Sequence, residues 1–252
     1  LNKLNYDNIP NIKNIGKQYL NLDYDPNCEY TVPYMWGTMG ILYNKDMVDE
    51  KDVKSWKAIY DKKYSGEIFM LDSERDAIGI TMKMLGYSMN SKDDGELAEA
   101  KKALIAQKPL VQAYCGDEGK DKMIANEGAL TIAWSGDAFY CMDLNDSLAY
   151  SIPEEGSNLW FDAMVVPVTS KHQTEAEKFI DFMCRPDIAK MNAEYIGYST
   201  ANVEGQKLLD KSVRDNRLRY PDLSELKDME IFAYDSELTE KYSELWQQLK
   251  VN

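Results

Sequence analysis

Strand-like and helix-like patterns alternate along nearly the whole chain of 252 residues. Runs rich in β-branched and aromatic residues, which favour strands, occupy 30–44, 67–71, 129–134 and 161–167. Amphipathic patterns with one apolar stripe occupy 73–85, 94–107, 174–183, 186–197 and 236–250. This alternation predicts an α/β protein, and the length allows one large domain or two lobes with separate cores.

Local signals predict where several helices begin and end. Ser55 is expected to cap a short helix that runs through Tyr60. The stretch from Thr174 to Glu177 has the S/T-x-x-E pattern of a capping box. Gly197 is a natural helix stop.

The charge balance limits the partners. The chain carries 43 acidic and 29 basic residues, a formal net charge of -14. Phosphate recognition needs a basic face, so nucleic acid is an unfavourable partner. Long-range attraction would suit a cationic ligand, although an acidic surface also serves solubility alone. No apolar run approaches the roughly 18 residues of a membrane helix.

The residues of common catalytic and metal sites are sparse. The cysteines at 28, 115, 141 and 184 form no C-x-x-C pair, so the sequence predicts no metal site. One disulfide is possible, but four free, buried thiols are favoured. The single histidine, His172, lies in a polar loop. No P-loop, G-x-G-x-x-G or H-E-x-x-H motif occurs, so neither a cofactor nor catalytic residues are expected. A carboxylate pair of the glycosidase kind stays open without positive support.

The segment Trp160-Phe161-Asp162 places a carboxylate beside an aromatic residue. Residues two apart in a strand face the same side, so Trp160 and Asp162 could present a ring and a charge to one ligand. An ammonium group suits both, through cation–π attraction and a charge-assisted hydrogen bond. On spacing alone, a core role for Trp160 and a turn cap at Asp162 are favoured over ligand binding.

A second carboxylate lies at the start of a predicted helix. Ser73 as N-cap and Asp76 as third helical residue would form a local cap. Ligand binding by Asp76 is compatible with that cap if one of its lone pairs stays free. Trp134 ends a predicted strand just before 135–137 and could line a cleft, with core packing as the alternative.

Several segments, taken in order, resemble the spermidine/putrescine-binding proteins of bacterial polyamine ABC transporters. They are V-P-Y-M-W-G-T at 32–38, L-G-Y-S at 85–88, A-W-S-G-D-A-F at 133–139, N-L-W-F-D at 158–162, R-P-D-I-A at 185–189, Y-I-G-Y-S-T-A-N at 195–202 and Y-P-D at 220–222. The resemblance implies a two-lobe periplasmic-binding-protein-like fold of type II, with the ligand in the cleft.

The same resemblance assigns roles to individual residues. Trp134, Trp160 and Tyr198 would be aromatic walls. Asp162 and Asp76 would take ammonium groups, the latter replacing a longer glutamate. At two positions the chain departs from the family. Ser73 stands where the family often has an aspartate, and Phe232 aligns with a polar glutamine. These departures leave the choice between putrescine and spermidine open.

Family members carry roughly a hundred more residues N-terminal to this chain, of domain size by themselves. We therefore expect a fragment that lacks most of the first lobe. The expected division is an irregular segment at 1–29 from the end of lobe 1, lobe 2 at 30–155, a remnant of lobe 1 at 156–199, and C-terminal helices returning to lobe 2 at 200–252. Such a remnant could be supported by a second chain, by an exchange between copies or by a rearranged packing, so self-association of the fragment is one of the open alternatives.

The implied function is non-catalytic: capture of a polyamine outside the cytoplasm for the permease subunits of an ABC importer, with lipid anchoring open. One alternative keeps the fold and binds another small cation, an amino-acid derivative or a sugar. A remote alternative is an acidic-residue hydrolase.

Overall fold

The computed structural model describes residues 1–251 and divides into two compact units. Unit 1 comprises Leu1–Gly37 and Trp160–Pro221, and unit 2 comprises Thr38–Leu159 and the chain from Asp222 onward. Residues 200–221, which the expected division gave to lobe 2, therefore fall in unit 1. The assignment of the units to particular lobes stays a prediction.

Unit 2 is built on a mixed sheet with the strand order β3-β2-β4-β1-β5. Its strands are β1 (Val32–Asn44, of which the part from Thr38 lies in unit 2), β2 (Ile68–Leu71), β3 (Val111–Cys115), β4 (Leu130–Trp134) and β5 (Leu148–Ser151). β2 runs parallel to β3 and β4, whereas β1 is antiparallel to β4 and β5. The predicted α/β class is confirmed.

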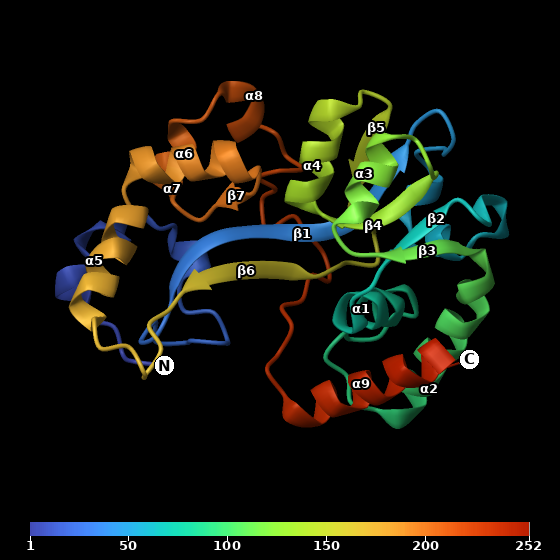
Figure 1. Ribbon diagram of the computed structural model, residues 1–252, viewed down its shortest axis with the longest axis horizontal. Coiled ribbons are helices and arrows are strands. Elements are labelled where there is room, and N and C mark those ends of the chain that lie inside the picture. The colour runs from blue at the N-terminus through green and yellow to red at the C-terminus, as the bar shows by residue number, and fades with distance from the viewer. Residues whose placement is uncertain (252) are drawn as a thin grey trace. The chain divides into compact units, whose positions relative to one another are not determined.

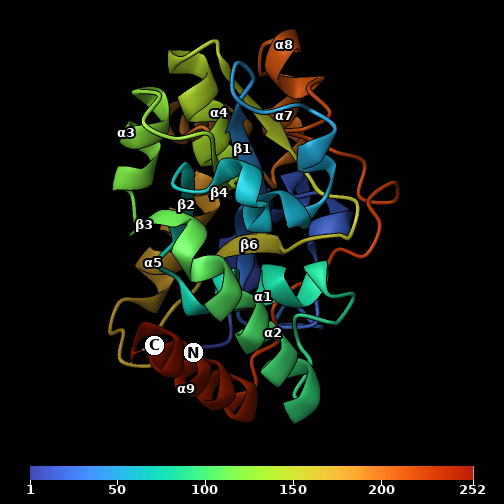
Figure 2. The same cartoon turned by 90° about the vertical axis from the view of Figure 1, so that its right-hand side faces the viewer.

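Helices cover both faces of this sheet (Figure 1). One face carries α1 (Glu74–Met84), α2 (Asp94–Gln107) and α9 (Ser236–Val251). The other carries α3 (Glu118–Ile124) and α4 (Ser135–Leu144). Figure 2 shows α2 and α9 side by side, where Lys101 Nζ donates to Gln248 Oε1 at 2.5 Å. The C-terminal helix is thus part of the core of unit 2.

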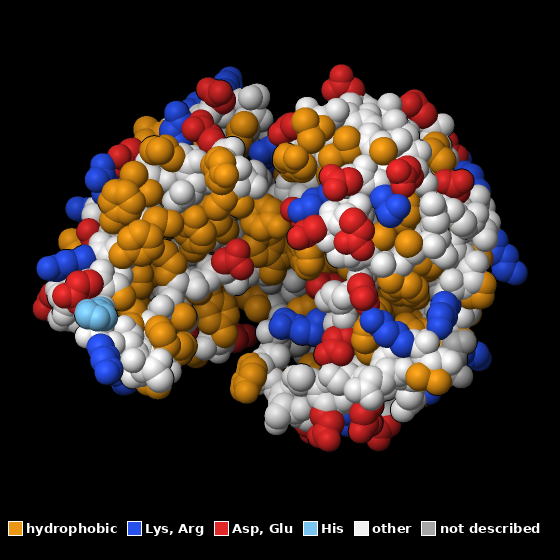
Figure 3. All heavy atoms as spheres, viewed as in Figure 1, with side chains coloured by type: hydrophobic (Ala, Val, Ile, Leu, Met, Phe, Trp, Pro, Cys, Tyr) orange, Lys and Arg blue, Asp and Glu red, His pale blue; other side chains and the backbone are white. Residues whose placement is uncertain are grey.

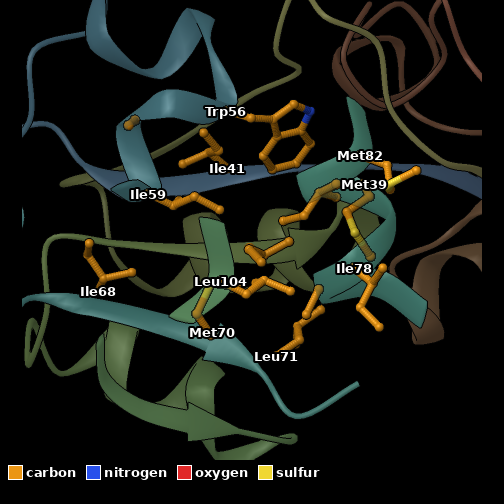
Figure 4. Close-up of a cluster of buried hydrophobic side chains, with 14 of the residues drawn as sticks. Met39, Ile41, Trp56, Ile59, Ile68, Met70, Leu71, Ile78, Met82 and Leu104 are labelled. Atoms are coloured by element: carbon orange, nitrogen blue, oxygen red, sulfur yellow. The ribbon is translucent and has the colours of Figure 1, made fainter. Parts of the chain in front are cut away.

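Alternate side chains along the strands of unit 2 belong to two different hydrophobic cores, one on each face of the sheet. Ile41 and Met70 point into the larger core under α1, α2 and α9 (Figure 4), and Ile132 belongs to the same core. Their neighbours Leu42 and Phe69 belong to the smaller core under α3 and α4. Successive side chains of a strand face opposite sides, so a sheet covered on both faces reads as a continuous apolar run.

Unit 1 contains shorter elements. The N-terminal segment, expected to be irregular, forms 3-10 turns at Tyr6–Asn8, Pro10–Asn14 and Lys17–Tyr19. Strands β6 (Leu159–Met164) and β7 (Ser199–Thr200) both pair with β1. The helices are α5 (Gln173–Met183), α6 (Pro186–Ile196), α7 (Val203–Lys207) and α8 (Lys211–Arg214).

Two buried carboxylates hold the N-terminal segment of unit 1. Asp25 accepts hydrogen bonds from the backbone amides of Glu29, Tyr30 and Thr31 and from the Thr31 hydroxyl. Glu177 of α5 accepts from the Asn5 amide and from Asn8 Nδ2. Buried carboxylates require such partners, so these two groups stabilise the turns against α5 and the strands.

The local signals gave mixed results. Ser55 does cap a turn that ends at Tyr60, a 3-10 helix, and Gly197 ends α6 with a left-handed φ of 85°. The predicted capping box at 174–177 is wrong. α5 begins at Gln173, its N-cap His172 makes no side-chain cap hydrogen bond, and Glu177 binds the N-terminal segment instead. Long-range partners displaced the local cap.

The four cysteines are free thiols, as favoured from the sequence, although the expected burial is wrong for one of them. Three are buried, whereas Cys28 is half-buried. No helix described for residues 1–251 is long and apolar enough to cross a membrane.

Candidate functional site

The side chains of strand β6 alternate between a face that contacts the buried Trp36 and the opposite face. The Phe161 ring stacks on Trp36 with centroids 6.4 Å apart, and Trp36 is 1% exposed. Because strand residues alternate, Trp160 and Asp162 share the opposite face. The alternative in which Asp162 caps a turn is wrong, since it lies within a strand. Trp160 is half-buried rather than a core residue.

Tyr198 joins Trp160 on this face. Their ring centroids are 5.1 Å apart with an interplanar angle of 59°. Tyr198 follows Gly197, whose left-handed backbone ends α6 and leads directly into β7. The structure thus brings together two of the three predicted aromatic walls.

The Asp162 carboxyl adds charge to this aromatic pair. Desolvation raises its pKa although the side chain is exposed. The pKa of Tyr34, on β1, is raised first by burial and then by the negative charge of Asp162. Tyr34 therefore lies near that carboxylate. It stands in the segment 32–38 that carried part of the resemblance, but the sequence gave it no role, because its partner lies more than a hundred residues away. We call Tyr34, Trp160, Asp162 and Tyr198 the aromatic half-site of unit 1.

Unit 2 contributes a second set of groups at the start of α1. Ser73 caps the helix, with its Oγ accepting from the Asp76 amide at 3.4 Å and donating to Asp76 Oδ2 at 2.7 Å. Asp76 is buried, with 8% of the residue exposed. Among the described residues, Ser73 is its only side-chain hydrogen-bond partner. Burial raises the pKa of Asp76, while the Ser73 hydrogen bond and the charge of Arg75 oppose that shift. The cap is confirmed, and it leaves acceptor capacity on Oδ1.

Phe232 reaches the same helix from the C-terminal part of the chain. The Arg75 guanidinium lies over its ring, with Cζ 4.4 Å from the centroid. The ring edge rests on Gly79, where an added Cβ would lie 2.6 Å from Phe232 Cζ. Only a glycine at position 79 lets the ring approach α1 this closely. We call Ser73, Arg75, Asp76 and Phe232 the carboxylate half-site of unit 2.

Trp134 stands at the junction of β4 and α4. It is half-buried, serves as N-cap of α4 and packs against the larger core. It lines a small cavity of about 20 Å³ with Lys120 and Asp137, which form an ion pair at 3.3 Å. For residues 1–251 the structure gives Trp134 no hydrogen bond or ring contact with Ser73, Asp76 or Phe232. Its ligand role stays a prediction.

Other chemistries find little support among residues 1–251. There, no group of three or more His, Cys, Asp or Glu side chains could hold a metal ion. His172 is exposed in the loop before α5. Each of the two half-sites instead contains a carboxylate of raised pKa and at least one aromatic ring.

Comparison with known proteins identifies the family to which this chain belongs. A family model described as Bacterial extracellular solute-binding protein matches residues 1–216. The chain belongs to this family. It is a binding component rather than an enzyme, so the hydrolase alternative is not supported, and the family works outside the cytoplasm.

Individual relatives agree. A curated spermidine/putrescine-binding periplasmic protein of Escherichia coli K12 is 33% identical over 250 residues, which cover 99% of this chain and 72% of the relative. The solved structure of a protein from Listeria monocytogenes, described as a spermidine/putrescine ABC transporter, shares 37% identity with a TM-score of 0.94, over 98% of this chain and 77% of the other. A spermidine/putrescine ABC transporter substrate-binding protein of Streptococcus pneumoniae shares 40% identity with a TM-score of 0.88, over 99% and 77% of the two chains. The periplasmic-binding-protein-like fold is therefore confirmed.

Proposed function

We propose that this chain is the ligand-capturing component of a polyamine ABC importer and binds putrescine or spermidine. The observation that carries the proposal is the aromatic half-site of unit 1, where Trp160 and Tyr198 pack at 5.1 Å beside the Asp162 carboxylate. Rings contact the methylene chain of a polyamine, and a carboxylate binds its ammonium group. The names of the relatives in Escherichia coli and Streptococcus pneumoniae support the ligand class.

The carboxylate half-site of unit 2 supplies a second anionic group. Asp76 is buried with one side-chain partner, which leaves it short of the hydrogen bonds that a buried carboxylate requires. A ligand ammonium would provide them. A cationic ligand also suits a chain with a net charge of -14.

A thermal-shift screen tests the ligand class. A ligand that binds only the folded chain adds about 2.7 kcal/mol at a hundredfold excess over its Kd, which corresponds to a rise in Tm of several degrees, about 2–4 °C per kcal/mol for a chain of this size. We expect this rise with putrescine or spermidine and none with glucose or glutamate. Stabilisation by glutamate or a sugar alone would overturn the proposal.

The alternative of another small cation or an amino-acid derivative has one observation in its favour. Phe232 and Arg75 offer no hydrogen-bond acceptor beside Asp76, so this end of the site suits fewer ammonium groups than a strongly acidic one would. The same screen includes lysine, agmatine and γ-aminobutyrate. A larger shift with one of these than with either polyamine favours the alternative.

We further propose, as partners, permease subunits of an ABC importer and a second copy of this chain. Large apolar side chains gather over α5, α6 and the end of β6 (Figure 3). The exposed ones in this part of unit 1 are Val165, Val168, Phe179, Phe182, Met191, Tyr195 and Ile196. Exposed patches of this kind mark interaction surfaces.

Light scattering after gel filtration tests self-association. We expect a mass above the 28.9 kDa of one chain, and a monomer for the double variant F179S/M191S. Tyr140, which is exposed on α4 of unit 2, provides the matched control Y140S. A monomeric parent chain, or unchanged association in the double variant, would exclude this surface.

A further inference from the structure

The stack of Arg75 on Phe232 places a resident cation beside the buried Asp76 carboxylate. Arg75 Cζ lies 4.4 Å from the ring centroid, a distance at which the guanidinium is held by cation–π attraction. Arg75 directly precedes Asp76 on α1. Among the described residues Arg75 forms no salt bridge, and the carboxylate on which its charge acts is Asp76, whose pKa it lowers.

The position of the ring is fixed by the helix under it. Phe232 packs against the larger core and touches Gly79, one turn after Arg75. A Cβ atom at position 79 would lie 2.6 Å from Phe232 Cζ, so the ring can pack here only because residue 79 is glycine. The ring and the guanidinium therefore form one fixed surface next to Asp76.

This surface cannot serve a second ammonium group. One face of Phe232 is already occupied by Arg75, so cation–π binding of a ligand there is blocked. The adjoining cavity of about 110 Å³ is lined by Arg75, Phe232, Ala233, Tyr234, Leu238, Thr239 and Tyr242, which include no carboxylate. An ammonium group entering it would lose water without gaining an anionic partner and would meet a positive charge.

We propose that the Arg75–Phe232 stack restricts the ligand end at Asp76 to a single ammonium group and so makes the chain prefer a diamine to a triamine. The proposal rests on the proposed function, because it requires that Asp76 binds a polyamine. Putrescine carries two ammonium groups and spermidine three at neutral pH. The third group of spermidine is the one that the stack disfavours.

Calorimetric titration of the 252-residue chain with putrescine and with spermidine tests this preference. We expect a Kd for putrescine at least fivefold lower than that for spermidine. F232Q supplies a hydrogen-bond acceptor and removes the ring, and R75Q removes the resident charge. Each should reduce the ratio of the two Kd values at least threefold, mainly by strengthening spermidine binding.

Phe182 and Arg185 provide the matched control, because this pair has the same chemistry in unit 1, with Cζ 5.4 Å from the ring centroid. F182Q should leave the ratio unchanged. A parent chain that binds spermidine as tightly as putrescine, or variants F232Q and R75Q that both keep the parent ratio, would overturn the inference while leaving polyamine capture intact. A chain that binds neither amine would overturn the proposed function as well.

Discussion

The Trp160 indole and the Tyr198 phenol lie 5.1 Å apart at an angle of 59°, on the face of β6 that also carries Asp162. The neighbouring Phe161 turns the other way and closes the aromatic core around Trp36. One strand thus supplies both a packing residue and two candidate ligand residues by simple alternation.

Replacing Trp160 tests the aromatic half-site. W160A removes a ring face worth about 0.5–2 kcal/mol to an ammonium, together with its apolar contact to the methylene chain. We expect polyamine affinity to fall roughly tenfold or more, measured by calorimetry, with W160F falling less. The control Y195A removes an aromatic side chain that is 92% exposed in the same unit. Equal affinities of W160A and Y195A would remove Trp160 from the site.

The Asp162 carboxylate should contribute by charge. D162N removes a charge-assisted hydrogen bond worth about 1.5–3 kcal/mol, so we expect a loss of affinity of roughly 10–100-fold. Raising the salt concentration should weaken binding of the parent more than that of D162N, because salt screens exposed charges. A salt dependence identical in both proteins would assign the charge effect to other residues.

Ligand affinity should fall in mildly acidic solution, because the two candidate carboxylates have raised pKa values. Desolvation raises the pKa values of Asp162 and Asp76 above the ordinary value of 3.8. Ammonium binding requires the ionised carboxylates, so affinity should be full well above these pKa values and fall as the pH drops through them. The fall should begin at a higher pH than for a carboxyl of ordinary pKa. Titration of Kd against pH, with D76N as comparison, measures this, and a Kd that stays constant down to pH 4 would contradict it.

Two other carboxylates should make the folding of unit 1 sensitive to acid. The folded-state pKa of Asp25 is lowered, because its four hydrogen bonds outweigh the desolvation that acts against them, and Glu177 behaves likewise. A depressed folded pKa adds stability above the unfolded values, here 3.8 and 4.5, and that stability is lost as the pH falls through the folded pKa. We expect D25N to lower the free energy of unfolding by about 1–3 kcal/mol at pH 7 and to flatten its acid dependence. Denaturant titrations at pH 7 and pH 3 check this, and a parallel pH profile in D25N would contradict it.

Two glycines with the same backbone conformation give a matched test of packing in unit 2. Gly156 and Gly66 have φ values of 82° and 80°. An added Cβ at Gly156 would lie 2.1 Å from the Asp228 carbonyl oxygen, whereas nothing lies within 4 Å at Gly66. G66A should cost about 1 kcal/mol of left-handed strain, and G156A clearly more. Thermal unfolding of both variants measures the difference. Equal losses of stability would mean that the backbone at Asp228 can move away from the added Cβ at little cost.

Sequence patterns predicted the elements whose determinants are local. The strands at 30–44 and 129–134, the Ser73 cap and the stop at Gly197 all depend on neighbouring residues. The alternation of Trp160 and Asp162 was equally readable, because it follows from strand geometry alone. Strand β3, strand β5 and helix α3 were not predicted.

What the sequence could not predict depends on distant partners. Phe232 meets Arg75 and Gly79 across more than 150 positions of the chain, and no local pattern shows that contact. Tyr34 acquires its place near Asp162 only when β1 and β6 pair. A distant partner also explains the wrong capping box, since the Glu177 carboxylate accepts a hydrogen bond from the Asn5 amide of the N-terminal segment.

The central claim is that carboxylates beside aromatic rings in this chain hold a polyamine. Calorimetric titration of the chain with putrescine and spermidine, in parallel with D162N and D76N, tests it most directly. We predict saturable binding of at least one amine to the parent chain and a loss of at least tenfold in each variant. Failure of both amines to bind, or parent-like affinity in both variants, would contradict it.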